Sequence, residues 1–428
     1  MSIVVSTLGF PRIGPRRELT QALESHWAGK TDTSALLEAA GGLRAATWAR
    51  QRAGGVTHIP SNDFSLYDHV LDTTAMVGAI PAIYGWQGGP VSLETYFAMA
   101  SGMRRDAGGD VPALEMTRWF DTNHHYMVPQ FTRGQDFELA STKVIDEYRE
   151  AAALGFRTRP VLLGPVTYLL LGKSKDDGLS SLPLLPGLLP VYFAVLRQLA
   201  AEGAAWVQID EPCLLLDLDD AARAALKSAY ATLAMAAPRL RLLLTTYFGA
   251  LGDNLDTALS LPVAGLHLDL ARAPEQLAVV HAKAPADLVL SLGVIDGRNV
   301  WRADLHEILD RITPTIAARG TDRVMIGPSC SLLHVPIDLK LEKALDPELT
   351  RWLAFAVQKL EELAILGSAI DNGRASVSDA LDASADAVAA RRTSTSITRS
   401  AVAYRIHTSA PWLSRRTQYS WIGVGSVE

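Results

Sequence analysis

Polar side chains follow several predicted strands of this sequence, at the strand ends where a parallel barrel carries its functional groups. Asp210 and Glu211 come directly after the apolar run WVQI, and a pair of carboxylates can act as acid and base. Neighbouring residues on a strand point to opposite faces, so we expect one of the two to be structural. Further polar groups that follow apolar runs are Tyr247, Asp269, Asp296, Ser329, Cys330 and Ser331. Catalysis by this cluster is the less favoured interpretation, because buried charges in barrels are often simply paired with arginines.

A second set of charges lies in FPRIGPRREL, residues 10–19, between a predicted strand and a predicted helix. The free N–H groups and the dipole at a helix amino terminus favour an anion, and Arg16 or Arg17 can add bidentate hydrogen bonds to a carboxylate or phosphate. The alternative is that these arginines pair with acidic residues on adjacent loops. Spacing leaves both interpretations open, because arginine serves both purposes.

The histidines do not show a metal-binding pattern. His124 and His125 are adjacent, and His267 alternates with Asp269, but neither pair has HExxH spacing or an evident third ligand. We therefore predict no metal site in this chain. The aromatic residues of WFDTNHHYMVP, residues 119–129, can stack on a flat ring or, more commonly, close one end of a barrel.

The elements that must position these groups follow a βα pattern. From residue 160 onward, continuous apolar runs, typical of strands covered on both faces, alternate with longer amphipathic segments. The candidate strands are residues 3–8, 56–60, 115–120, 160–163, 206–210, 241–245, 265–269, 288–292 and 323–327. These are nine candidates for the eight places of a (β/α)8 barrel, so one is expected to lie outside the ring. We predict an α/β fold, a TIM-type barrel with insertions, over residues 1–374.

Glycines mark the ends of two predicted helices, residues 145–154 and 191–202, because glycine tolerates the left-handed conformation just past a helix. Apolar residues recur at helical spacing over residues 347–366, which predicts a long face that packs on the core rather than binding a cofactor. Residues 375–428 are expected to lie outside the barrel, with an outer helix and a linker over residues 375–396 and an irregular tail over residues 411–428.

Composition limits the function classes. With 428 residues, 48% of them hydrophobic and 20% charged, the chain can bury the core of one large domain. A net charge of -6 argues against a general nucleic-acid binder. Prolines interrupt the apolar run 182–196, and the amino terminus lacks a signal pattern, so we predict a cytoplasmic protein without a membrane helix. The two cysteines, Cys213 and Cys330, are predicted to stay separate reduced thiols.

Several segments resemble the amino-terminal half of the cobalamin-independent methionine synthase family: STLGFPRIGPRREL, EMTRWFDTNHHYMVP, VLLGPVTYLLLGK, WVQIDEP, LLLTTYF, DGRNVWRADL and PSCSLLH. The resemblance runs from residue 6 to about Arg405. It implies two related (β/α)8 barrels and the transfer of a methyl group from 5-methyltetrahydropteroyltriglutamate to homocysteine. The family's zinc, homocysteine and pteridine sites belong mainly to the carboxy-terminal barrel, which this chain is expected to lack.

The positions that match the family's zinc ligands carry weaker donors in this chain. The family has a His-x-Cys pair, then a Glu, then a Cys, whereas the matching segments here offer Thr245, Tyr247, Asp269 and Cys330. Zinc takes about four N or S donors, or three and a water, so one thiolate and one carboxylate fall short. The resemblance therefore implies no zinc, no other cofactor and no catalytic residue here, and a chain that is inactive alone.

What the resemblance assigns to this half is contact with the tail of polyglutamated 5-methyltetrahydrofolate. The matching positions are Arg16, Arg17, Glu18 and Leu19, with Arg118 at the place of a family lysine. The planar guanidinium group of arginine replaces the compact ammonium group of lysine at that position, so the geometry of the tail contact is expected to differ.

The leading interpretation is a folate-tail-binding barrel of a methionine synthase, which works with a separate or fused catalytic barrel. One alternative is a non-catalytic polyglutamate-folate-binding or scaffold protein, because fold alone does not fix function. A less favoured alternative is a decarboxylase, since uroporphyrinogen decarboxylase is similar in fold, but the arginine-lined porphyrin cleft that it needs is not evident. Neither nucleic acid nor a membrane is an expected partner.

Overall fold

A computed structural model, which describes residues 2–103, 110–174, 178 and 180–394, shows a closed parallel barrel. The eight strands of its sheet are β1 (Val4–Val5), β2 (Ile59–Ser61), β6 (Thr158–Leu163), β8 (Trp206–Asp210), β9 (Arg241–Thr245), β10 (Gly265–Asp269), β11 (Val289–Ile295) and β12 (Val324–Pro328). They follow the order β1-β12-β11-β10-β9-β8-β6-β2. A parallel bridge between Ser6 and His58 joins the two ends of this order. The predicted (β/α)8 architecture is confirmed.

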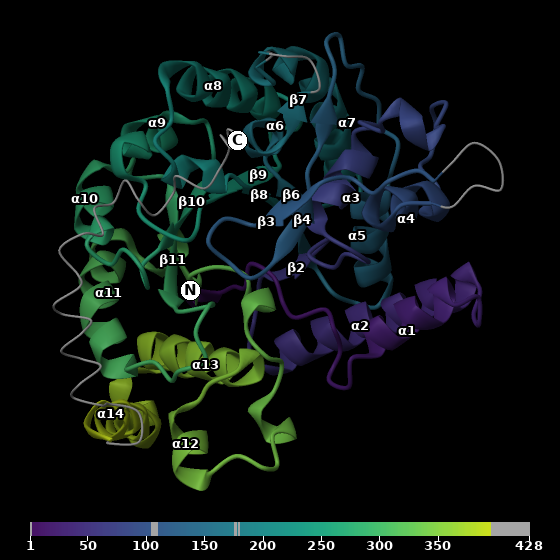
Figure 1. The fold of residues 1–428 in the computed structure, drawn as a ribbon. Helices are drawn as coiled ribbons and strands as arrows, with labels where there is room; N and C mark the ends of the chain where they lie inside the picture. The colour runs from purple at the N-terminus through teal and green to yellow at the C-terminus, as the bar shows by residue number, and fades with distance from the viewer. Residues whose placement is uncertain (1, 104–109, 175–177, 179, 395–428) are drawn as a thin grey trace, which may run out of the picture.

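Helices surround this ring of strands (Figure 1). Their bounds are α1 (Glu18–Trp27), α2 (Thr33–Ala53), α3 (His69–Met76), α4 (Leu93–Ser101), α5 (Lys143–Ala153), α6 (Pro165–Leu171), α7 (Leu185–Ala201), α8 (Asp220–Ala234), α9 (Leu255–Ser260), α10 (Gln276–Lys283), α11 (Leu305–Arg319), α12 (Pro347–Trp352), α13 (Ala356–Asn372) and α14 (Ser378–Thr393). Gly155 and Gly203 follow α5 and α7 with φ angles of 79° and 88°, as their predicted role at helix ends requires.

The ninth predicted strand lies outside the ring, as the count of candidates requires. Residues 116–118 form β3 (Met116–Arg118), which pairs antiparallel with β4 (His125–Met127). We call this insertion the β3–β4 hairpin. A second small sheet pairs β5 (Gln130–Phe131) with β7 (Lys173–Ser174). Most of the inserted chain therefore lies between β2 and β6, and β7, which follows α6 (Pro165–Leu171), pairs with it.

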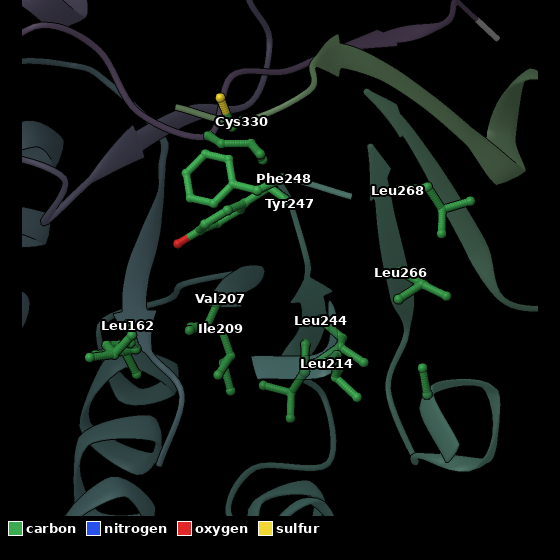
Figure 2. Close-up of a cluster of buried hydrophobic side chains, with 14 of the residues drawn as sticks. Leu162, Val207, Ile209, Leu214, Leu244, Tyr247, Phe248, Leu266, Leu268 and Cys330 are labelled. Atoms are coloured by element: carbon green, nitrogen blue, oxygen red, sulfur yellow. The ribbon is translucent and has the colours of Figure 1, made fainter. Parts of the chain in front are cut away.

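The two faces of the barrel strands differ in polarity. The side chains that pack under the helices are apolar, and Figure 2 shows those of Leu162, Val207, Ile209, Leu244, Leu266 and Leu268 on β6, β8, β9 and β10. The interior holds hydrogen-bonded polar groups instead. Arg159 donates to Gln208 Oε1 at 2.9 Å, and His267 Nδ1 lies 2.9 Å from Ser291 Oγ. All four of these residues are at most 2% exposed. Hydrogen bonds to one another and to the backbone therefore offset the cost of burying their polar atoms.

Helix α7 corrects the expectation that prolines interrupt the run 182–196. The segment Leu182–Ala201 forms continuous helix, and by length and composition alone it is apolar enough to cross a membrane. Proline is tolerated in a first helical turn, which accounts for Pro186, and Pro190 follows one turn later inside the helix. The helix packs against α5, α6 and α8, and 44% of the apolar window is buried inside the fold.

The predicted packing face over residues 347–366 is confirmed, but its helix is broken. Trp352, Leu353, Phe355 and Leu360 are all at most 6% exposed. Between α12 and α13, residues 353–355 are extended because Leu353 bridges Trp301 and Ala354 N donates to Val300 O at 2.8 Å. This pairing with residues 300 and 301 thus interrupts the single helix that the spacing of the apolar residues predicts.

The predicted outer helix is present as α14, which lies against α11. Leu305 N donates to Ser384 Oγ at 3.2 Å, and His306 Nε2 lies 2.9 Å from Asp382 Oδ1. The expected tail, residues 411–428, lies outside the described residues. Cys213 and Cys330 are both free and buried, as predicted.

Candidate functional site

A cavity of about 90 Å³ lies at the carboxyl ends of the barrel strands. Residues of the insertions and of the barrel line it together, among them Arg12, Asp68, His69, Trp119, Asp210 and His334. Sites for small organic ligands usually have volumes of roughly 300–1,000 Å³. The mouth of the barrel thus has room for water molecules or a small group, and its side chains largely fill it.

The adjacent carboxylates Asp210 and Glu211 point in different directions, as predicted. Asp210 faces the cavity, where Gln208 Nε2 and the Tyr247 hydroxyl donate to it at 2.7 and 3.3 Å. Burial raises the pKa of Asp210 to about 7 although these hydrogen bonds act in the opposite direction. Glu211 turns toward α6 and accepts from Val166 N and Thr167 N at 3.3 and 2.7 Å. Glu211 is therefore the structural member of the pair, because it caps the free N–H groups of α6.

Three histidines gather at the mouth as neutral packing groups. The His69 ring meets the Trp119 ring edge-on at 4.3 Å, and the His124 and His334 rings lie 4.8 Å apart. Burial, followed by the charge of Arg12, lowers the pKa of His69 to about 4, and burial lowers that of His334 to about 3. Within the described ranges, no group of three His, Cys, Asp or Glu side chains could hold a metal ion.

The positions that match the family's zinc ligands do not fit zinc. Asp269 is occupied by backbone donors, since Phe248 N, Ala271 N and Arg272 N bond to it at 2.9, 3.0 and 2.9 Å. The Thr245 hydroxyl lies 3.4 Å from Leu243 O inside the barrel. Figure 2 shows Tyr247 and Phe248 beyond the end of β9, below Cys330, and burial raises the pKa of the Cys330 thiol well above its usual range. One protonated thiol and one fully bonded carboxylate do not make a zinc site.

The segment that carries Arg16 and Arg17 has a different local structure from the one expected. The helix begins at Glu18, and Arg17 precedes it in a left-handed conformation with φ 63°. The Glu18 carboxylate turns back and accepts from Arg16 N at 2.9 Å. The carboxylate thus binds a backbone N–H two residues ahead of α1 and does not cap the helix itself, so an anion on the N–H groups of this helix stays a prediction.

The guanidinium groups of Arg16 and Arg17 are nevertheless available. Both residues are exposed, and in the described part of the chain no hydrogen bond or ion pair engages their side chains. Within the described ranges, neither of them shows the pairing with acidic loop residues that the alternative interpretation expects. Leu19 is buried in an apolar cluster with Leu23 and Leu36, which anchors α1 on α2. Three of the four expected tail residues thus reach the surface, and the fourth fixes the helix.

Arg118 is exposed on β3, where it lies opposite His125 of β4. Among the described residues, no contact joins Arg118 to Arg16 or Arg17. The two segments do meet indirectly, because Arg12 and Trp119 line the same cavity. The segment that carries Arg16 and Arg17 and the β3–β4 hairpin therefore lie at the same rim of the barrel.

A charged cluster near this rim is absent from the sequence predictions. Lys143 Nζ lies 3.2 Å from Asp72 Oδ2 and 3.0 Å from Glu147 Oε1, and it donates to Asn62 Oδ1 at 2.8 Å. The cluster separates the mouth from an outer cavity of about 370 Å³ under α2 and α5. Its members come from distant segments without a common motif. Arg12, in contrast, belongs to FPRIGPRREL and could have been named with Arg16 and Arg17.

Comparison with known sequences assigns most of the chain to one family. Residues 4–319 match the family described as cobalamin-independent synthase, N-terminal domain. The 5-methyltetrahydropteroyltriglutamate–homocysteine methyltransferase of Nitrobacter winogradskyi is 66% identical over 96% of this chain and 55% of its own length. The enzyme of that name from Caulobacter vibrioides is 62% identical over 97% of this chain and 55% of its own length. The chain thus spans about half the length of these relatives.

Solved structures share the fold at low sequence identity. A B12-independent methionine synthase from Shewanella, in complex with selenomethionine, superposes with a TM-score of 0.57 at 12% identity, over 81% of this chain and 92% of that one. A methyltransferase from Methanosarcina mazei gives a TM-score of 0.50 at 12% identity, over 86% and 94% of the two chains. These likenesses support the barrel architecture.

Proposed function

The chain belongs to the cobalamin-independent methionine synthase family, and from that premise we propose that its barrel binds the polyglutamate tail of 5-methyltetrahydropteroyltriglutamate. The observation that carries the proposal is the pair of exposed guanidinium groups of Arg16 and Arg17, which have no partner among the described residues. Elsewhere around the mouth, the guanidinium groups of Arg272 and Arg298 are engaged by Asp121. Unengaged arginines beside a rim are the groups that an added carboxylate can reach.

The tail site works by charge complementarity. Each further glutamate brings a carboxylate, which a guanidinium fork can hold with two parallel hydrogen bonds. Arg118 on the β3–β4 hairpin is the third cation of the proposed site. Exposed ion pairs contribute only about 0.2–1 kcal/mol each, so the affinity is modest and falls as salt screens the charges.

The methyl transfer itself is assigned to another barrel, separate or fused, that carries the family's zinc. Thr245, Asp269 and Cys330 of this chain do not supply a zinc ligand set, so this barrel binds and orients the tail in the cytoplasm. We expect the isolated chain to hold no stoichiometric zinc after dialysis and not to methylate homocysteine. Elemental analysis that found one tightly held zinc per chain, together with thiol-dependent methyl transfer, would contradict this assignment.

Calorimetry at low salt tests the tail site. We expect the triglutamate form of 5-methyltetrahydrofolate to bind more tightly than the monoglutamate form. The double variant Arg16→Ala/Arg17→Ala should lose most of that preference. The double variant Lys227→Ala/Arg239→Ala is the matched control, because it removes the same charge from exposed positions on and after α8. Equal affinity for the two ligands, or an unchanged preference in the first double variant, would end the proposal.

A further inference from the structure

We propose that Asp121 is a positioning residue of the tail site, because it clamps the β3–β4 hairpin, and with it Arg118, across the mouth of the barrel. The clamp consists of Asp121, Arg272 and Arg298. Its importance for ligand binding rests on the proposed function, whereas its effect on the hairpin can be measured without any ligand.

Asp121 lies in the turn of the hairpin and is held from two directions. Its Oδ2 accepts from Arg272 Nη1 at 2.8 Å, and its Oδ1 accepts from Arg298 Nη1 at 2.6 Å. Arg298 Nη2 also donates to the backbone oxygen of Asp121 at 3.0 Å. The two arginines are 151 and 177 residues away in sequence and follow β10 and β11. Successive barrel loops therefore converge on one carboxylate.

Both arginines are themselves fixed to the barrel. Arg272 N donates to Asp269 Oδ1 at 2.9 Å, and its Nη1 donates to Phe248 O at 3.2 Å. Arg298 N donates to Asp296 Oδ1 at 2.8 Å, and its guanidinium lies 5.0 Å from the centre of the Phe248 ring. Little side-chain freedom remains to be lost when they hold Asp121, so the clamp is preorganised.

The charge of Asp121 is maintained by the two arginines. Its side chain is 28% exposed, and partial burial by itself acts to raise its pKa. The hydrogen bonds and charges of Arg272 and Arg298 outweigh that effect and hold the pKa below its usual value. Removal of the negative charge would leave two cations facing each other at the hairpin turn. Their repulsion and the lost hydrogen bonds would both release the turn.

Arg118 lies on the β3 strand of this hairpin, whose β4 strand is held on the barrel by other contacts: the Tyr126 hydroxyl donates to Leu171 O at 3.2 Å and Met127 N donates to Asp68 Oδ2 at 3.0 Å. A two-stranded hairpin is marginally stable by itself, and each strand here has only three residues. Trp119 is buried and its backbone N–H donates to His124 O at 2.8 Å, which ties the strands together. The clamp fixes the turn end of this unit, three residues from Arg118.

The test compares Asp121→Asn with Asp256→Asn in the full chain. Asp256 is a matched control, because it is an exposed carboxylate paired with a single lysine, Lys283. Hydrogen exchange of residues 116–127 should become about tenfold faster in Asp121→Asn, the factor expected when charge-assisted hydrogen bonds are lost, with unchanged exchange in the barrel strands. Calorimetry should show weaker triglutamate binding and unchanged monoglutamate binding. Arg298→Lys, which keeps the charge but loses the fork, should give intermediate values.

Unchanged exchange of residues 116–127 in Asp121→Asn would overturn the clamp. Equally faster exchange throughout the barrel would also overturn it, since the effect would then be global destabilisation. Faster local exchange with an unchanged triglutamate preference would overturn the positioning of Arg118. A wild-type chain without any triglutamate preference would instead refute the proposed function, and the exchange result would still decide whether the clamp exists.

Discussion

The interior of the barrel and the segment before α1 both carry charged and polar side chains, but the two regions differ in how far water can reach those groups. Inside the barrel, Gln208 and His267 are 0% exposed and bonded to neighbouring groups. At the rim, Arg16 and Arg17 are exposed and have no side-chain partner in the described ranges. Buried polar groups must satisfy one another, so residue types that suggest catalysis are used here for architecture.

The two regions also differ in charge near neutral pH. Burial raises the pKa of Asp210 and of Glu211 to about 7 and lowers that of His267 to about 3. Both directions reduce the charge that the interior carries, because desolvation disfavours the ionised form of either type. The arginines at the rim remain charged at any relevant pH. A polyanionic ligand is therefore attracted to the rim.

Among the variants that test this comparison, Glu211→Ala is expected to lose the most stability. The change removes the acceptor of Val166 N and Thr167 N at the start of α6 and leaves these donors buried. We expect the free energy of unfolding to fall by about 3 kcal/mol, measured by urea denaturation. Asp256→Ala, which removes an exposed carboxylate, should cost less than about 1 kcal/mol. Equal losses in the two variants would contradict the structural role of Glu211.

Gly164→Ala should be the next most damaging change, because the Glu211 carboxyl group fills the space beside Gly164. An added Cβ would lie 2.0 Å from Glu211 Cδ. Overpacking of this kind costs about 1–3 kcal/mol. Gly187→Ala is the control, since its Cβ would meet only Phe137 at 3.6 Å and alanine favours the helix. A lower denaturation midpoint for Gly187→Ala than for Gly164→Ala would show that the packing argument is wrong.

The pH dependence of stability should be reduced in His267→Asn. The pKa of His267 is about 3 in the folded chain and near 6.5 when unfolded, so below pH 6.5 only the unfolded state binds the proton. This histidine therefore removes about 1.4 kcal/mol of stability for each pH unit as the pH falls below 6.5. The raised pKa of Asp210 acts in the opposite direction, so the comparison is made as the difference between variant and wild type. Parallel stability curves from pH 7 to pH 5 would refute this prediction.

The smallest effect on stability is expected at the rim. Arg16→Ala/Arg17→Ala should change the free energy of unfolding by less than about 0.5 kcal/mol, because exposed side chains without partners contribute little. The same double variant should abolish most of the triglutamate preference. A stability loss as large as that of Gly164→Ala would show that these arginines hold the fold, and the contrast between rim and interior would disappear.

Much of the fold was predictable because the barrel strands are covered on both faces. Residues 206–210, 241–245 and 265–269 were expected as strands from their apolar character, and they match β8, β9 and β10 residue for residue. The expected strand at residues 3–8 shrinks to Val4–Val5, since pairing with β2 at Ser6 is a single bridge. The residue at which a strand ends depends on the segments that pair with it, and the local pattern of apolar residues does not contain that information.

The sequence by itself determined the βα alternation, the placing of Asp210 and Asp269 at strand ends, and the resemblance of FPRIGPRREL and EMTRWFDTNHHYMVP to one family. These features depend on residues close together in the chain. The tertiary structure decided which of Asp210 and Glu211 faces the cavity, that the Glu18 carboxylate turns back to Arg16 N, and that Asp121 meets Arg272 and Arg298. Such contacts join segments up to 177 residues apart or depend on backbone direction at a single residue. Only the closed barrel, which brings its strand ends to one rim, fixes them.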